Sequence, residues 1–276
     1  MLRTRLAVAV LATGMILPGA AASAGDNSSG SGFFWNWFAG DWSLTLGAAG
    51  FVAPSYEGAK DMALSGAPMI SLSRAGSTTL FSSRNDNPGF ALYDTGTFRI
   101  GPVGKLLLPR DSGTSNDLRG LKDVPFGGEA GLFAEYFPTD WMRLRAEVRQ
   151  GFLAHHGVVA DFAADAFTNI SPVVQVSAGP RLSLASDRYF GAYYGVSASE
   201  AIASGLTAYS PGGGVKSVGV GGAVTWKATD RITTQLFGEY SRLTGPAADS
   251  SLVKERGSPN QFMIGISATY RFGFTL

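Results

Sequence analysis

The amino-acid sequence predicts an all-β protein, a transmembrane antiparallel up-and-down β-barrel of about twelve strands. Three observations support this fold class. A secretory signal stands at the N-terminus, a long strand of alternating character stands at the C-terminus, and short turns alternate with long loops between them. Together they indicate a chain that is exported and then crosses a membrane with strands.

The C-terminal strand, residues 261–276, shows the alternation most clearly. Small or polar residues fill the odd positions from Gly265 onward. The even positions are all apolar or aromatic: Phe262, Ile264, Ile266, Ala268, Tyr270, Phe272, Phe274 and Leu276. Because side chains on a strand alternate between faces, this strand has one apolar and one polar face. The alternative, a strand of a soluble β-sandwich, rarely carries so long an apolar run, whereas a membrane strand needs ~9–11 residues with its apolar face toward lipid.

The N-terminus has the three parts of a secretory signal peptide. Basic residues Arg3 and Arg5 precede an apolar run over residues 6–17, and Ala22-Ser23-Ala24 forms a small-residue cleavage site. We therefore predict a signal peptide over residues 1–24. Its removal lowers the basic residues from 22 to 20 against 21 acidic residues, a balance that gives no electrostatic reason to expect a nucleic-acid partner.

The composition excludes several classes of protein and favours one compartment. The absence of cysteine excludes disulfides, a thiol nucleophile and a thiolate metal site. No segment after the signal is a continuous apolar run of ~18 residues, which excludes a helical membrane protein. With 37 glycines, 12% aromatic and only 16% charged residues, an exported chain of alternating strands is typical of the bacterial outer membrane.

Residues 25–40 are expected to form a flexible and aromatic periplasmic segment ahead of a barrel domain at residues 41–276. A Gly/Ser-rich stretch is followed by a cluster of aromatic side chains at Phe33, Phe34, Trp35, Trp37 and Phe38. One interpretation is anchoring at the membrane–water boundary, where aromatic residues are enriched. The other is a docking patch for a protein partner.

Twelve strands follow from alternating segments separated by turn residues. The first five are expected at residues 42–53, 67–74, 78–84, 88–93 and 97–108, of which 78–84 and 88–93 form a weaker pair around Asn85-Asp86-Asn87. The next seven are expected at residues 128–137, 141–152, 173–185, 189–196, 215–227, 232–243 and 261–276. The count becomes ten or fourteen if the 78–94 region or the 153–172 region is assigned differently, since 153–172 fits a long loop or an extra hairpin.

The connections between these strands fall into two kinds. Short turns are expected near Ala75, Thr95, Thr139, Ser186 and Asp230, and long loops at residues 54–66, 110–127, 153–172, 197–214 and 244–260. The tight turn at 85–87 is an exception on the long-loop side. An even strand number with both termini beside the short turns places the termini in the periplasm.

Charged residues of both signs occupy the polar faces of the strands. Candidates for lining the lumen are Arg99, Lys105, Glu129, Glu135, Arg143, Arg145, Glu147, Arg149, Arg181, Lys227, Glu239 and Arg271. In a barrel of about twelve strands the lumen is narrow, so mixed charges are expected to pair and close it. The alternative is a narrow channel, in which the arginines of residues 143–149 would favour anions.

No residues form a recognisable catalytic, metal or cofactor site. His155 and His156 are adjacent and would point to opposite faces of a strand, although Asp161 and Asp165 lie nearby. A hydrolase would need a serine or an aspartate beside one of these histidines. No Lys-Ser/Thr follows Gly212-Gly213-Gly214 in the register of a phosphate loop, and no helix follows either, so this stretch is expected to be a loop hinge.

Several short segments together resemble one family. They are Pro54-Ser-Tyr-Glu-Gly58, Glu135-Tyr-Phe-Pro-Thr139, Gly179-Pro-Arg-Leu-Ser183, Tyr194-Gly-Val-Ser197, Ala203-Ser-Gly-Leu206, Tyr209-Ser-Pro-Gly-Gly213, Glu239-Tyr-Ser-Arg-Leu243, Ala247-Ala-Asp-Ser250, Gly257-Ser-Pro-Asn-Gln261 and Tyr270-Arg-Phe272. From about Trp42 to Phe272 the chain resembles the MipA/OmpV family (MltA-interacting protein) of outer-membrane proteins. Members commonly end near the last motif, whereas this chain extends to Leu276.

The resemblance implies an outer-membrane barrel that links two peptidoglycan-remodelling enzymes, a lytic transglycosylase and a penicillin-binding protein, to the outer membrane. We therefore expect a monomeric barrel with a structural role, which is not an enzyme and has no cofactor. The alternatives are a narrow channel for small solutes and a membrane-embedded hydrolase.

Overall fold

The computed structural model describes residues 7–8, 41–74 and 81–275, with no side-chain detail for 7–8 and 71–74. The expected signal peptide, apart from Ala7 and Val8, and the whole of segment 25–40 lie outside the described residues. So do the aromatic side chains of Phe33–Phe38.

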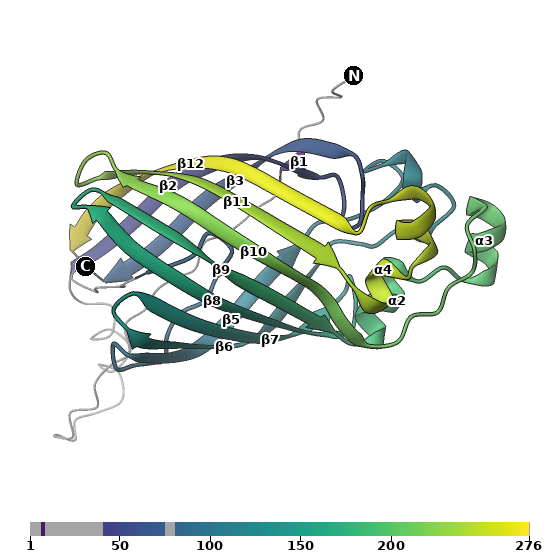
Figure 1. Cartoon of the computed structure of the whole chain (residues 1–276), viewed down its shortest axis with the longest axis horizontal. Coiled ribbons are helices and arrows are strands. Elements are labelled where there is room, and N and C mark those ends of the chain that lie inside the picture. Colours follow the sequence, from purple (N-terminus) through teal and green to yellow (C-terminus); the bar gives the residue numbers. More distant parts are fainter. Residues whose placement is uncertain (1–6, 9–40, 75–80, 276) are drawn as a thin grey trace.

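The described chain forms a 12-stranded sheet in the order β1-β3-β2-β12-β11-β10-β9-β8-β7-β6-β5-β4. Its long strands are β2 (Asp41–Pro54), β3 (Met62–Arg74), β5 (Phe98–Leu107), β6 (Gly127–Thr139), β7 (Met142–Phe152), β8 (Val158–Ser171), β9 (Val174–Ala185), β10 (Gly214–Lys227), β11 (Ile232–Leu243) and β12 (Asn260–Thr275). The short strands are β1 (Ala7–Val8) and β4 (Tyr93–Asp94). All pairings except β1 with β3 are antiparallel, and the sheet curves into an elongated barrel (Figure 1).

The predicted barrel fold is confirmed, and β12 shows why the sequence specifies it. The even-numbered side chains Phe262, Ile264 and Ile266 are 50%, 45% and 61% exposed, whereas Gln261 and Ser267 are buried. The apolar face therefore points outward and the polar face inward, the reverse of a soluble protein and the arrangement that lipid requires. None of the helices in the described ranges is long and apolar enough to cross a membrane.

The sheet has a seam between β3 and β4. Within the described residues no backbone pairing joins β3 to β4 or β5. On the β5 side, residues 88–94 follow the free edge of β5: the Leu92 amide donates to the Ile100 carbonyl at 2.9 Å and the Gly104 amide to the Pro88 carbonyl at 2.8 Å. The predicted strand at 88–93 is thus present in irregular form.

Its predicted partner at 78–84 is not a strand where the structure describes it. Residues 81–87, called here the inner segment, turn into the barrel instead. The turn is closed by the Asp86 amide, which donates to the Ser83 carbonyl at 3.2 Å, and the Phe81 ring stacks on Phe167 of β8 at 4.7 Å. The inner segment leaves the sheet because its polar residues find charged partners inside, as described below.

The 153–196 region also differs from the prediction. Residues 153–172 contain β8, a full barrel strand that pairs with β7 and β9, and the short turn lies at 172–173. The predicted strand at 189–196 and the predicted turn at Ser186 are wrong, because this stretch is the helix α2 (Asp187–Tyr194). The buried aromatic residues Tyr189, Phe190 and Tyr194 lie on one face of this helix. A high density of aromatic residues is also typical of strands, which explains the wrong prediction.

Loops close one end of the barrel. The cap, defined as residues 55–61, 108–126, 186–213 and 244–259, contains α2, α3 (Ala198–Ser204), α4 (Gly245–Ala248), the 3-10 turn Asn116–Leu118 and the π-helical turn Leu252–Arg256. Its helices gather at the end of the barrel opposite the C-terminus (Figure 1). Phe190, Tyr194 and Ala247 of the cap are fully buried in an apolar cluster that also contains Val159, Ala185 and Leu243 of the barrel strands.

Candidate functional site

A row of charges lines the interior face of β7. Arg143, Arg145, Glu147 and Arg149 alternate along the strand and are 0%, 8%, 4% and 0% exposed. The intervening Leu144 and Val148 are exposed on the outer face, as the two-residue period of a strand requires. Burial of so many charges is stable only if each one is paired and hydrogen-bonded.

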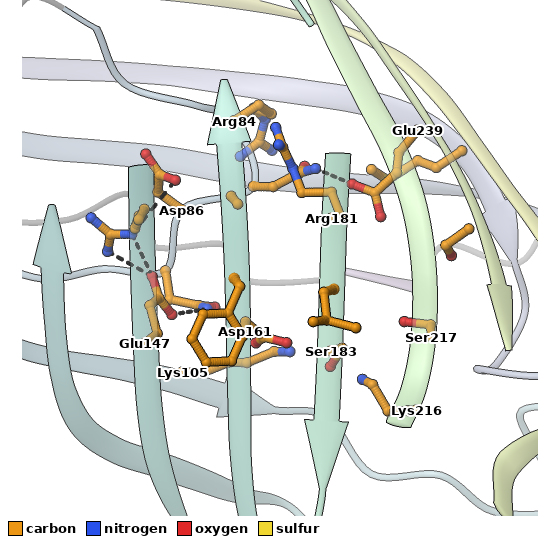
Figure 2. Close-up of a pocket in the computed structure, with 18 of the residues that line it drawn as sticks. Arg84, Asp86, Lys105, Glu147, Asp161, Arg181, Ser183, Lys216, Ser217 and Glu239 are labelled. Atoms are coloured by element: carbon orange, nitrogen blue, oxygen red, sulfur yellow. Dashed lines mark hydrogen bonds and ion pairs between the residues drawn. The ribbon is translucent and has the colours of Figure 1, made fainter. Parts of the chain in front are cut away.

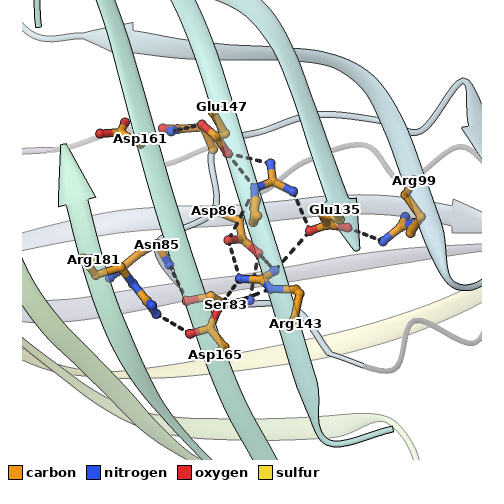
Figure 3. A network of polar contacts seen from close by, with 12 residues as sticks. Ser83, Asn85, Asp86, Arg99, Glu135, Arg143, Glu147, Asp161, Asp165 and Arg181 are labelled. Carbon is orange, nitrogen blue, oxygen red and sulfur yellow. Dashed lines mark hydrogen bonds and ion pairs between the residues drawn. The ribbon is translucent and has the colours of Figure 1, made fainter. Parts of the chain in front are cut away.

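Arg143 is the centre of this interior network (Figure 3). Its guanidinium contacts carboxylates from three different segments: Asp86 of the inner segment at 2.6 Å, Glu135 of β6 at 3.1 Å and Asp165 of β8 at 2.7 Å. A planar guanidinium with five donors can satisfy several carboxylates at once, which a lysine cannot. Arg143 therefore joins two strands and the inner segment.

The other two arginines of β7 continue the network along the strand. Arg145 contacts Glu135 and Glu147, each at 2.6 Å. Arg149 contacts Glu129 at 2.7 Å and also pairs with Glu147. Each guanidinium lies between two or more carboxylates, so Coulombic attraction and charge-assisted hydrogen bonds offset the cost of removing these groups from water.

The inner segment is tied to opposite walls of the barrel. Asn87 donates to Glu147 of β7 at 2.7 Å, and Asp86 pairs with Arg143 on the same strand. On the other side, Asn85 donates to Glu239 of β11. The segment thus crosses the lumen, and three consecutive residues at its C-terminal end reach charged partners on both sides.

A cavity of about 330 Å³ remains between the inner segment and the cap (Figure 2). Its charged lining residues are Glu57, Asp86, Glu147, Asp161, Glu239, Arg84, Lys105, Arg145, Arg181 and Lys216. Phe51, Phe237 and Met263 form an apolar part of its wall. The balanced charges give the cavity no strong preference for one sign of solute.

The cap is fastened over this cavity by buried polar contacts. Arg110 donates to the Tyr193 carbonyl at 2.7 Å, and its guanidinium lies 6.0 Å from the centre of the Tyr56 ring. Burial lowers the pKa of Arg110 and raises the pKa of Tyr56 and of Tyr193 to about 12. Arg256 donates to the Asp117 carbonyl at 2.6 Å. These contacts join separate loops into one closed layer.

Glu57 connects the cap to the barrel wall. Its carboxylate pairs with Lys216 of β10 at 2.9 Å and accepts a hydrogen bond from the Tyr189 hydroxyl at 2.8 Å. Burial by itself raises the pKa of Glu57, but the Lys216 charge and these hydrogen bonds outweigh burial and hold the pKa below its ordinary value. Its side chain remains 33% exposed, so solvent weakens the pair.

We expect this connection to loosen in acid. A carboxyl group whose pKa is depressed by folding stabilises the folded state above its unfolded pKa, and that stabilisation is lost as the pH falls through the folded value. Cap loops should therefore become more sensitive to protease as the pH falls below about 4.3, the ordinary pKa of glutamate. Glu57→Gln should show the same sensitivity already at pH 7 and a smaller change in acid. An unchanged pH profile in this variant would assign the effect to another group.

His155 is buried beneath the cap and has no partner suited to hydrolysis. Its Nε2 lies 3.1 Å from Glu129, and its Nδ1 accepts a hydrogen bond from the Gly157 amide at 3.1 Å. In the described part of the chain none of its hydrogen bonds goes to a serine or an aspartate. For His156 the hydrogen bond is made by its backbone carbonyl, which accepts from Gln150 at 2.9 Å. Among the described residues neither histidine thus has the partner that would favour a hydrolase, and no group of three or more side chains could hold a metal ion.

The remaining predicted residues lie in different places. Arg99 pairs with Asp94 at 3.0 Å and Glu135 at 2.9 Å, and Lys105 and Glu239 line the cavity. Arg181 pairs with Asp165, whereas Lys227 and Arg271 are exposed near the short turns.

The prediction did not include several charged residues of the interior: Arg84, Asp86, Asp161, Asp165 and Lys216. The two aspartates of β8 could have been found from alternation once that strand was recognised. Lys216 lies at a β-bulge between Val215 and Ser217, which shifts the alternation by one residue. No sequence pattern indicates that the inner segment enters the barrel.

Comparison with known proteins identifies one family and several loosely similar structures. The model of the family described as MltA-interacting protein MipA matches residues 46–272. No curated protein matches the chain.

Solved structures with similar strand arrangements are outer-membrane proteins of low sequence identity. Neisserial surface protein A is 11% identical, with 84% of this chain and 99% of that chain aligned at a TM-score of 0.28. A bacterial polysaccharide outer membrane secretin is 10% identical, with 84% and 98% aligned at a TM-score of 0.42. Ail of Yersinia pestis is 8% identical, with 85% and 99% aligned at a TM-score of 0.22. Similarity at this level carries no argument about function.

The family match covers most of the strands and the whole cap, so it includes the charged interior and the cavity. The outward apolar faces of those strands fit a lipid environment. The chain belongs to the MltA-interacting protein MipA family and lies in the bacterial outer membrane.

Proposed function

We propose that the protein is a non-conducting, non-enzymatic barrel that acts as an interaction protein of the outer membrane. The observation that supports this most is the inner segment, which crosses the lumen and is tied to β7 through Arg143 and to β11 through Glu239. The cap covers the other side of the remaining cavity. A barrel obstructed at two levels is better suited to holding a partner than to passing a solute.

The partner that we propose is a lytic transglycosylase. The name of the family describes its members as interacting with MltA, and the sequence resemblance implies a scaffold that joins such an enzyme to a penicillin-binding protein. The aromatic cluster Phe33, Phe34, Trp35, Trp37 and Phe38 is our candidate docking segment, because tryptophan and other aromatic residues are enriched among the residues that contribute most to protein interfaces. Anchoring of these residues at the membrane surface is the competing interpretation.

One preparation of refolded full-length mature protein tests both parts of the proposal. In a planar bilayer it should be electrically silent, with heat-modifiable gel mobility as the control for folding. The same preparation, immobilised in detergent, should retain a purified lytic transglycosylase. Replacing Trp35 and Trp37 with alanine should weaken that retention at least tenfold, whereas Trp141→Ala at a short turn should not.

The outcomes separate the competing functions. Steady single-channel openings of the folded protein would contradict the closed-barrel part of the proposal and favour the channel. Silence without retention of the enzyme would contradict the proposed partner. Retention that is unchanged by the Trp35 and Trp37 replacements would leave membrane anchoring as the role of the aromatic segment.

A further inference from the structure

A second, much smaller void lies where the inner segment meets β9, β10 and β11. Its volume is about 10 Å³, roughly the space for one water-sized particle. Its lining is rich in hydrogen-bond donors: Arg84, Asn85, Ser177, Arg181 and Gln235. No aspartate or glutamate lines it. Such a lining fits a small negatively charged ligand.

Arg84 is the unusual member of this lining. It is only 7% exposed, and its Nε and Nη2 atoms have no hydrogen-bond partner. Its guanidinium lies 5.3 Å from the centre of the Phe237 ring, and within the described residues it forms no ion pair. In contrast to Arg84, every arginine of β7 has at least two carboxylate partners.

Arg181 brings a second guanidinium to the same place, close to Arg84 in Figure 2. Its Nη2 pairs with Asp165 and its Nη1 donates to the Pro180 carbonyl at 2.9 Å, but its Nε has no partner. Glu239, the only carboxylate of β11, accepts from Asn85 and lines the larger cavity together with both arginines, but it does not line the void. Two arginine side chains that each carry an unpartnered donor therefore line one small space.

A buried cation without a counter-charge is costly, and a buried donor without an acceptor adds to that cost. A water molecule in the void could accept from two donors but would leave the charge uncompensated. A monoatomic anion has no fixed acceptor direction, so it can accept from several donors at once, and it supplies a negative charge. The volume excludes an organic anion or a phosphate.

We propose that this void is a halide site, occupied by chloride under physiological conditions, between Arg84 and Arg181. The bound ion links the inner segment to β9, which adds a third attachment to those at β7 and β11. Halide binding then stabilises the position of the inner segment inside the lumen. This inference concerns the inner segment alone and does not depend on the identity of the partner protein.

The halide dependence of stability tests the proposal. The refolded full-length mature protein in detergent is heated at constant ionic strength while gluconate, which is too large for the void, is replaced by chloride. A ligand that binds only the folded state stabilises it in proportion to the logarithm of its concentration, once that concentration exceeds the dissociation constant. The midpoint temperature of unfolding should therefore rise with the logarithm of the chloride concentration. Arg84→Gln should abolish this slope. Arg242→Gln, an exposed arginine outside the void, should retain it.

A direct measurement guards against failure of the Arg84 variant to fold. Crystals of the unmodified protein grown in bromide should show an anomalous scattering peak between the guanidinium groups of Arg84 and Arg181. A flat chloride dependence in the wild type, or a slope that persists in Arg84→Gln, would overturn the proposal. So would density for water alone at this position in the bromide crystals.

Discussion

Replacing Arg143 with methionine is expected to destabilise the folded barrel by about 3–5 kcal/mol, the usual cost of removing one partner from a buried ion pair. The side chain is fully buried and contacts Asp86, Glu135 and Asp165. Methionine fills much of the space but leaves these carboxylates without their shared cation. The free energy of unfolding, measured by urea titration of the protein refolded in lipid, gives the effect directly.

Three further variants identify the cause of that loss. Arg143→Lys keeps the charge but cannot serve three carboxylates in one plane, so its loss should be intermediate. Adding Asp86→Asn to Arg143→Met removes one of the carboxylate charges that lost its partner and should restore part of the stability. Arg231→Met, in an exposed turn, should leave the stability unchanged. A loss for Arg143→Met no larger than that for Arg231→Met would show that the interior network contributes little.

Features that depend only on neighbouring residues in the chain could be predicted from the sequence. The faces of β7 and β12 follow from the two-residue period alone, so Arg143, Arg149 and the outward Ile264 could be assigned without any tertiary information. The same rule gives the barrel class, because an apolar face of that length is stable only against lipid.

The errors arose where distant partners decide the structure. The 78–84 segment has a strand-like composition, but from residue 81 onward the chain lies inside the barrel, where the adjoining Asp86 pairs with Arg143. The α2 stretch is dense in aromatics, and as a helix it buries Tyr194 and Phe190 in an apolar cluster between the cap and the strand ends. At Lys216 a bulge shifts the alternation by one residue, and single-sequence patterns do not locate bulges.

Release of the inner segment is the second change with a large expected effect. Alanine at Asn85, Asp86 and Asn87 removes its polar ties to Glu239, Arg143 and Glu147. Hydrogen bonds to charged groups are each worth about 1.5–3 kcal/mol. The population in which the segment leaves the lumen should therefore rise at least ~100-fold, since 1.4 kcal/mol corresponds to a factor of ten. Arg143 keeps Glu135 and Asp165 as partners, so the wall itself should remain folded.

The absence of cysteine from the sequence makes this population measurable. A single Ser217→Cys change places a thiol on the wall of the cavity. A reagent that enters the barrel from the end with the short turns must pass the inner segment to reach this thiol. Modification of this thiol by a small charged thiosulfonate should be slow in the parent protein and about 100-fold faster with the three alanines, if access is limited by the same equilibrium. Asp230→Ala, in an exposed turn, should not change the rate. Equal rates in all three proteins would mean that reagents reach the cavity by another route, through the cap or the seam beside β3, and that the inner segment does not close the lumen.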